Sequence, residues 1–147
     1  MAKVPHNERN LESESNGLSH LLNSDPRLIG PTLEQKRLLL EILEYPRKYT
    51  RSFDLVRLNV ASFSEVKSKA DFVLIEVKVT RAKLINFPKG FFFGMTENEE
   101  NLLQELEGYF LLCLISIHPE SLEWRYFTFS DLQTHIKTKR IQYQINL

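Results

Sequence analysis

Hydrophobic side chains recur at helical spacing in two parts of the chain, and each part opens with a polar capping pattern. Between Thr32 and Pro46, leucine and isoleucine return every three or four residues, and Gln35 stands three places after the threonine. The same arrangement recurs between Thr96 and Gly108, and glycine suits the end of a helix. A threonine followed three places later by Gln or Glu is typical of a helix start. Both segments are therefore predicted to be helices.

Other segments alternate apolar and polar positions or are rich in β-branched and aromatic residues, which favours strands. They are residues 53–60, 72–80, 91–93, 109–117, 125–129 and 141–145, and a short helix capped by Ser130 separates the last two. The first two should pair as neighbours. The run 109–117 is apolar on both faces, as expected of a strand in mid-sheet. This order predicts an α/β fold with a mixed central sheet flanked by helices.

Residues 1–30 differ from the rest because they are polar, with only the cluster Leu18, Leu21 and Leu22 to bury. Such a segment offsets little of the entropy lost on ordering. We therefore expect a mobile polar N-terminal arm, whose leucine cluster could also contact a partner or a second copy. Residues 31–147 then form the α/β domain, and a chain of 147 residues suits one hydrophobic core.

Composition narrows the classes of function. Nineteen Lys and Arg balance nineteen Asp and Glu, so any nucleic-acid site must come from local clustering of charge. The one cysteine, Cys113, lies in an apolar run and should be a buried thiol. The N-terminus lacks a signal-peptide pattern and no stretch approaches the roughly 20 apolar residues that span a bilayer, so we expect a cytoplasmic protein without a membrane partner. The histidines show no metal-ligand spacing.

The strand 72–80 carries the main candidate chemistry. Side chains alternate along a strand, so Glu76 and Lys78 share one face with the apolar Phe72 and Leu74. Burying a carboxylate or an ammonium group alone is costly, so the pair needs each other, a metal ion or water. A carboxylate beside a lysine suits metal-assisted phosphodiester hydrolysis. An ordinary cross-strand salt bridge would have the same spacing.

The motifs around this strand follow one another in a recognisable order. They are Phe53-Asp54-Leu55, Ile75-Glu76-Val77-Lys78, Phe91-Phe92-Phe93, Thr96-Glu97-Asn98-Glu99 and Tyr109-Phe110-Leu111-Leu112. In order and spacing they resemble the PD-(D/E)XK, or restriction-endonuclease-like, nuclease superfamily. Within it they are similar to the bacterial domain family of unknown function related to the C-terminal domain of the NO VEIN protein.

The resemblance implies a restriction-endonuclease-like core over residues 31–147 and a Mg²⁺- or Mn²⁺-dependent endonuclease that hydrolyses DNA. It implies Asp54, Glu76 and Lys78 as the catalytic set, with the metal held by Asp54, Glu76 and the carbonyl of Val77. A homodimer and a larger defence or repair complex stay open as partners. The alternative is a non-catalytic nuclease-like module that binds nucleic acid or a partner protein.

The second metal-binding acid can be chosen between Asp54 and Asp71. Asp71 stands five residues before Glu76, and an odd offset on a regular strand directs two side chains to opposite faces. Asp54 is far enough away for a paired strand to return and bring it near Glu76. We therefore predict that Asp54, and not Asp71, joins Glu76.

Three further groups of charged residues could each take part in function or simply belong to the solvated surface. Arg81, Lys83 and Lys89 follow the Glu-x-Lys strand and could bind nucleic-acid phosphates or belong to a solvated loop. Lys137, Lys139 and Arg140 form a second basic cluster with the same two interpretations. Some superfamily members add a carboxylate from the first helix, and Glu34, Glu41 or Glu44 could serve here, although a solvated helix face explains them equally well.

Overall fold

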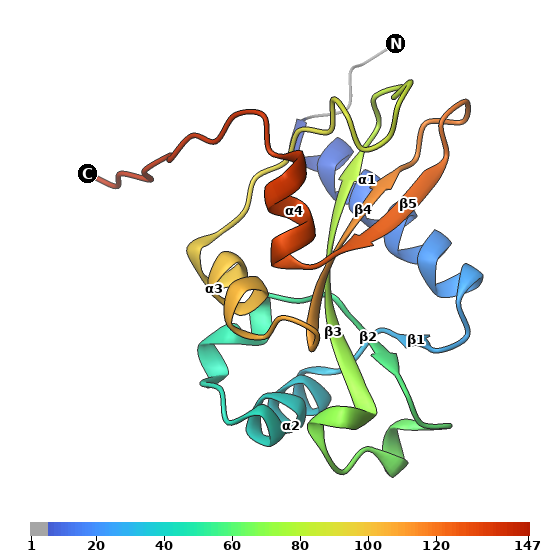
Figure 1. Cartoon of the computed structure of the whole chain (residues 1–147), viewed down its shortest axis with the longest axis vertical. Coiled ribbons are helices and arrows are strands. Elements are labelled where there is room, and N and C mark those ends of the chain that lie inside the picture. Colours follow the sequence, from blue (N-terminus) through green and yellow to red (C-terminus); the bar gives the residue numbers. More distant parts are fainter. Residues whose placement is uncertain (1–5) are drawn as a thin grey trace.

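The computed structural model describes residues 6–147, with side chains from residue 11 onward. Over this range the chain is a mixed α/β fold, with a five-stranded sheet flanked by four α-helices (Figure 1). The helices are α1 (His6–Ser24), α2 (Leu33–Leu43), α3 (Glu97–Glu105) and α4 (Phe129–His135). The strands are β1 (Leu28–Ile29), β2 (Leu55–Leu58), β3 (Phe72–Thr80), β4 (Phe110–Ser116) and β5 (Glu123–Phe127). The predicted fold class is confirmed.

The five strands stand in the sheet in the order in which they occur in the chain. The pairs β1–β2, β2–β3 and β4–β5 are antiparallel, whereas β3 and β4 are parallel. A parallel neighbour requires a crossover connection, and α3 lies within it. Leu55 of β2 lies opposite Ile75 of β3, so the predicted pairing of residues 53–60 with residues 72–80 is confirmed.

Each face of the sheet has its own hydrophobic core, because side chains alternate along the strands. On one face Phe72 and Leu74 pack with apolar residues of α2, α3 and α4. On the other face Ile75 and Val77 pack with Leu21 of α1. The sheet is thus the middle of three layers, and Glu76 and Lys78 lie on the face that α2, α3 and α4 cover.

The helix starts follow the predicted capping chemistry. Thr32 and Thr96 accept hydrogen bonds from the main-chain N–H groups of Gln35 and Glu99, and both capping boxes are complete. The short helix α4 is an exception. Its cap is Thr128, which accepts from the N–H of Asp131, and not the predicted Ser130. Asp131 stands three places after this threonine and completes the capping box, and its side chain accepts the N–H of Thr128.

The N-terminal segment differs from the mobile arm expected for residues 1–30. Residues His6–Ser24 form α1, and Leu21 is 1% exposed against the sheet. Gly17 lies so close to β3 that a Cβ atom there would be 2.6 Å from Cγ2 of Val79. Composition underestimated this contact because one leucine and one glycine suffice when the sheet already presents a flat apolar surface. The part of the expectation that concerns residues 1–5 lies outside the described residues.

Two predicted strands are absent from the described sheet. Residues 91–93 form an extended connection in which Phe91 and Phe93 pack on the core while Phe92 is 91% exposed. Both edges of β3 are already paired with β2 and β4, so the segment cannot pair with that strand. Residues 141–145 are likewise not a strand. Their alternating Ile141, Tyr143 and Ile145 are exposed in a tail that leaves the body of the molecule (Figure 1).

Cys113 is buried on β4, as its apolar neighbours predict. Burial raises the pKa of its thiol to about 12, so the thiol stays protonated at neutral pH and is a poor nucleophile. None of the helices in residues 6–147 is long and apolar enough to cross a membrane.

Candidate active site

Asp54 and Glu76 lie side by side because of the register between β2 and β3. Leu55 pairs with Ile75, and the N–H of Asp54 donates to the carbonyl of Ile75 at 2.9 Å. Just beyond this pair, the side chains of Asp54 and Glu76 are close enough to share a hydrogen bond. Lys36 of α2 fixes the preceding turn, since its Nζ donates to the carbonyls of Phe53 at 2.9 Å and Thr50 at 3.2 Å.

The main chain of Val77 faces the Asp54 carboxylate. On β3, Leu74 donates to Tyr109 and Thr80 accepts from Ile117, so the even-numbered residues bond towards β4. The N–H and C=O of Val77 therefore point to the opposite edge, at a level of the sheet that lies before β2 begins at Leu55. The Oδ2 atom of Asp54 accepts from this N–H at 2.9 Å. The carbonyl of Val77 is directed to the same edge as the Asp54 carboxylate.

Glu76 is a buried carboxyl group among other carboxyl groups. The residue is 6% exposed. Burial, repulsion from Asp54, a hydrogen bond shared with Asp54 and repulsion from Glu99 raise the pKa of Glu76 to about 10, while the charge of Lys78 opposes the rise. Such a group is protonated near neutral pH unless a cation is brought to it. The charge of Lys78 is therefore too small to keep Glu76 ionised at neutral pH, and a further cation would favour the ionised form.

Lys78 is held between two carboxylates on the same face of the sheet. Its Nζ lies 2.8 Å from Oε2 and 3.2 Å from Oε1 of Glu99, and 3.8 Å from Oε1 of Glu76. The lysine side chain is 19% exposed and the Glu99 side chain 6%. An ion pair with so little exposure is only weakly screened by salt.

A further acid, Glu14, approaches from α1. Burial of its carboxyl group and repulsion from Asp54 and then Glu99 raise the pKa of Glu14, and attraction to Lys78 opposes the rise. The residue as a whole is exposed, so its carboxyl end is the part that enters the field of the site. Glu14 thus belongs to the same electrostatic cluster as Asp54, although it comes from the segment that was expected to be an arm.

The acids proposed from the predicted first helix lie elsewhere. Glu34, Glu41 and Glu44 are exposed on or next to α2. That helix packs against the turn Lys69–Asp71, which precedes β3. None of these acids is among the groups that shift the pKa of Glu76 or Glu14, and the solvated-face interpretation describes them.

The donors present suit Mg²⁺ or Mn²⁺, which prefer oxygen ligands. Asp54 and Glu76 offer carboxylate oxygens, and Val77 offers a main-chain oxygen. The raised pKa of the buried Glu76 carboxyl indicates that the charge of Lys78 does not offset its burial. In the part of the chain that the structure describes, no group of three His, Cys, Asp or Glu side chains is arranged to hold a metal ion. Two carboxylates completed by water and substrate phosphate are nevertheless a common arrangement for Mg²⁺.

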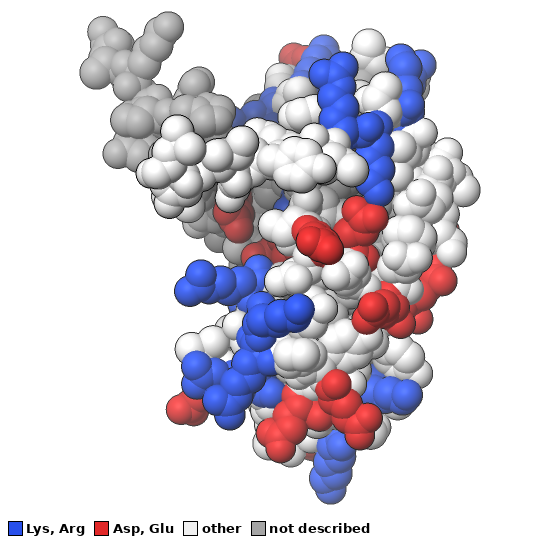
Figure 2. Space-filling model, turned by 90° about the vertical axis from the view of Figure 1, so that its left-hand side faces the viewer, with Lys and Arg blue, Asp and Glu red and all other residues white. Residues whose placement is uncertain are grey.

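The basic residues after β3 are exposed, and Figure 2 shows the charge pattern of one face of the molecule. Lys83 pairs with Glu120 at 2.6 Å, and Lys89 borders a hollow of about 390 Å³ formed by the segment Ala82–Gly90. In the second basic cluster, Lys139 pairs with Glu100 of α3 at 3.0 Å. Basic and acidic groups alternate over the face drawn in Figure 2, so no continuous basic surface covers it.

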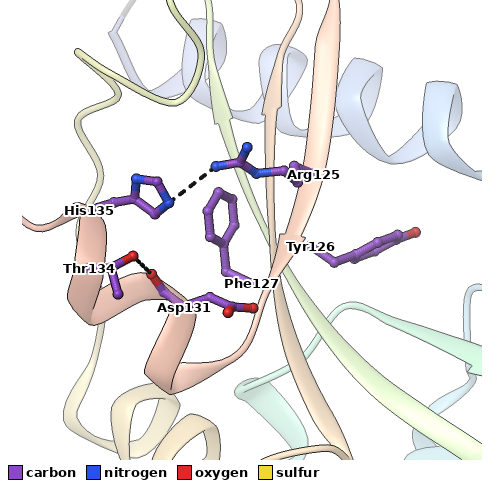
Figure 3. A pocket seen from close by; sticks show the side chains of 6 residues that line it. All are labelled: Arg125, Tyr126, Phe127, Asp131, Thr134 and His135. Atoms are coloured by element: carbon purple, nitrogen blue, oxygen red, sulfur yellow. Dashed lines mark hydrogen bonds between the residues drawn. The ribbon is translucent and has the colours of Figure 1, made fainter.

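A hollow of about 280 Å³ lies between β5 and α4, and none of the clustered acids lines it. Figure 3 shows Arg125, Phe127 and His135 gathered on one side of β5, whereas Tyr126 points to the other side. Arg125 lies 3.3 Å from Nε2 of His135 and its guanidinium stacks over the ring of Phe127. This hollow lacks a pair of carboxylates, so the acidic cluster on β3 is the better candidate for chemistry.

Sequence reasoning found Asp54, Glu76, Val77 and Lys78 but assigned no chemical role to Glu14 or Glu99. For Glu99 a signal existed, since it is the third helical residue of a predicted capping box, and the N-terminus of a helix favours a carboxylate. For Glu14 the signal was weaker. Leu11, Leu18 and Leu21 recur at helical spacing around it.

Comparison of the chain with protein-family models, with curated proteins and with solved structures finds no match.

Proposed function

We propose that the chain is a metal-dependent endonuclease that hydrolyses DNA at the Asp54–Glu76–Lys78 site. The observation that carries the proposal is that two carboxylates, one main-chain carbonyl and one lysine meet where β2 begins beside β3. The raised pKa of Glu76 supports it, since a divalent cation would supply the missing positive charge. The α/β architecture agrees with the restriction-endonuclease-like core that the resemblance implies.

Each residue has a role that follows from its position. Asp54, Glu76 and the carbonyl of Val77 would hold the metal. Bound there, Mg²⁺ supplies positive charge that activates a water nucleophile and neutralises the phosphate. Lys78 keeps an ammonium group beside Glu76, where it stabilises the negative charge that develops on the phosphate oxygens. The N–H of Val77 fixes the Asp54 carboxylate through a main-chain hydrogen bond, so that ligand does not need to reorient.

Nucleic-acid contacts are proposed for Arg81, Lys83 and Lys89. They lie in the segment that leaves the Thr80 end of β3, and they are exposed. Such residues bind phosphates without reading the base sequence, and binding should weaken as salt rises. The ion pair between Lys83 and Glu120 must open for Lys83 to contact a phosphate, so Arg81 and Lys89 should contribute more.

A non-catalytic module is the second candidate, and one observation favours it. Lys78 is closer to Glu99 than to Glu76, and Asp54 already accepts a main-chain hydrogen bond, so both groups have partners without a metal. A protein of that kind would bind nucleic acid or a partner through the same fold. It would be indifferent to divalent cations.

The two candidates separate in a metal titration. We expect Mn²⁺ to raise the melting temperature, because a ligand that binds only the folded state adds about 2.7 kcal/mol of stability at a hundred times its Kd. Glu76→Gln should abolish this effect, and the matched control Glu41→Gln, an exposed acid on α2, should retain it.

Cleavage is then measured on supercoiled plasmid with Mg²⁺ or Mn²⁺ at high protein concentration. Nicked or linear plasmid with the wild type and intact plasmid with Glu76→Gln is the expected result. If the wild type neither gains stability with Mn²⁺ nor nicks any of several DNA substrates, the endonuclease proposal fails and the binding module is favoured.

A further inference from the structure

Lys78 is placed where it could neutralise Glu76 and so compete with a metal ion for it. The lysine lies two residues after Glu76 on the same face of β3, and its ammonium group is 3.8 Å from the carboxylate. Glu76 is buried, which makes any nearby positive charge effective. The function of the site therefore depends on which group determines the position of the lysine.

Glu99 is the closer of the two carboxylates that pair with Lys78. Both of its oxygens lie within 3.2 Å of Nζ, and Oε1 also accepts the N–H of Thr96 at 3.1 Å. The side chain is therefore fixed from two directions, by the lysine and by the start of α3. The N-terminus of a helix stabilises a negative charge, so this carboxylate is better supported than Glu76.

We propose that Glu99 is a positioning residue that draws Lys78 towards α3 and thereby leaves the Glu76 carboxylate free for a divalent cation. The inference rests on the proposed function, because it takes Glu76 as a metal ligand. It goes beyond that function by assigning a second task to the capping box of α3. The box starts a helix and also separates the lysine from the metal ligand.

The other capping boxes of the chain supply variants that keep the helix start. In α2 the third helical residue is Gln35 and in α4 it is Asp131, and both boxes are complete. Glu99→Gln should therefore keep the cap while removing the charge that holds Lys78. Asp131→Asn is the matched control, since it removes a charge at the same position of a capping box whose residues do not contact Lys78.

The test is a double-mutant cycle read as Mn²⁺ affinity by calorimetry, using Glu99→Gln, Lys78→Met and the double variant. Loss of a residue that orients a metal site typically weakens metal binding by about 10–100-fold, and we expect Glu99→Gln to fall in that range. In the Lys78→Met background the same substitution should have little effect, because no lysine remains to be held. Asp131→Asn should leave the affinity unchanged.

The alternatives give different patterns. If Glu99→Gln weakens Mn²⁺ binding equally with and without Lys78, Glu99 acts as a bystander charge or as a ligand, and the positioning role is wrong. If Glu99→Gln leaves the affinity unchanged in the wild-type background, the role is equally wrong, while the endonuclease proposal stands. If the wild type binds no Mn²⁺, the proposed function itself fails, and this inference fails with it.

Discussion

Asp71 and Glu76 lie just before and within the same strand, and their surroundings shift their pKa values in opposite directions. Asp71 precedes β3, and its Oδ2 accepts from the N–H groups of Lys67 at 2.9 Å and Ser68 at 3.0 Å. These main-chain hydrogen bonds lower the pKa of Asp71. Glu76 lies further along β3, where burial and neighbouring carboxylates raise its pKa to about 10. Asp71 is a satisfied turn residue, whereas Glu76 lacks a sufficient counter-charge.

The difference shows that the backbone decides which acid is available. The turn before β3 directs two free N–H groups at Asp71, so its charge is fully supported by the protein. In the second half of β3 the N–H of Val77 bonds to Asp54, and the buried Glu76 carboxyl shares a hydrogen bond with Asp54, another acid, which favours its protonated form. Glu76, whose negative charge the protein stabilises less well, is therefore the acid suited to bind a cation.

The largest effect should come from Asp54→Asn. The change keeps the size of the side chain but removes one of the two carboxylates beside the proposed metal. A bound metal supplies several kcal/mol to phosphate hydrolysis, so its loss should lower the cleavage rate by roughly 10³-fold. Mn²⁺ affinity by calorimetry and plasmid nicking should fall together. Normal nicking by this variant would show that the two carboxylates do not act as one site.

The next effect tests whether α1 supports the Thr80 half of β3. Gly17→Ala would place a methyl group 2.6 Å from Val79, so the helix must move away from the sheet. We expect a loss of about 1–3 kcal/mol, as for other overpacked contacts, although alanine is the better helix former. Glu14 stands three residues earlier on the same helix, so Mn²⁺ binding should weaken as well.

Thermal unfolding and Mn²⁺ titration measure this prediction. Gly94→Ala is the control, since a Cβ atom there meets no other atom within 4 Å. Equal melting temperatures for the two variants would mean that α1 does not pack on β3 through Gly17.

A further effect is a pH dependence of stability that belongs to Glu76. Its folded-state pKa is about 10 against an ordinary value of 4.5, so between these values the metal-free folded protein holds a proton that the unfolded chain has lost. The free energy of unfolding should therefore fall as pH rises through this window, by up to about 1.4 kcal/mol per pH unit, and be unaffected below it.

Urea unfolding of the wild type and Glu76→Gln between about pH 5 and pH 9 measures the difference. The glutamine variant should gain in relative stability as pH rises, because it has no carboxyl group to ionise. Parallel curves for the two proteins would show that Glu76 does not retain its proton. Mn²⁺ should also bind the wild type more tightly at higher pH, since the cation displaces that proton.

The sequence predicted the strong local patterns and missed the features that depend on distant partners. The capping boxes, the apolar strands and the face of β3 that carries Glu76 follow from spacing of a few residues, and the structure has them. Whether Leu21 is buried depends on a sheet surface that includes Leu55, Ile75 and Ile115, which are far from it in the chain. The alternating tail at 141–145 would need a free strand edge, which periodicity does not reveal. The closeness of Glu14 and Glu99 to Lys78 arises from packing of α1 and α3, which no local motif encodes.

The smallest effect should come from Asp71→Asn, and it completes the comparison between the two acids. Asp54 lies beside Glu76, and Asp71 is engaged with Lys67 and Ser68 in the turn before β3. Asparagine can still accept one of those main-chain hydrogen bonds, so the turn should persist. We expect cleavage and Mn²⁺ affinity to stay at the wild-type level. Stability in acid should change slightly. The lowered pKa of Asp71 stabilises the folded protein above pH 3.8, and this contribution is lost as pH falls. Crystals soaked in Mn²⁺ provide the direct measurement: anomalous density between Asp54 and Glu76 is expected, and density beside Asp71 would reverse the assignment of the two acids.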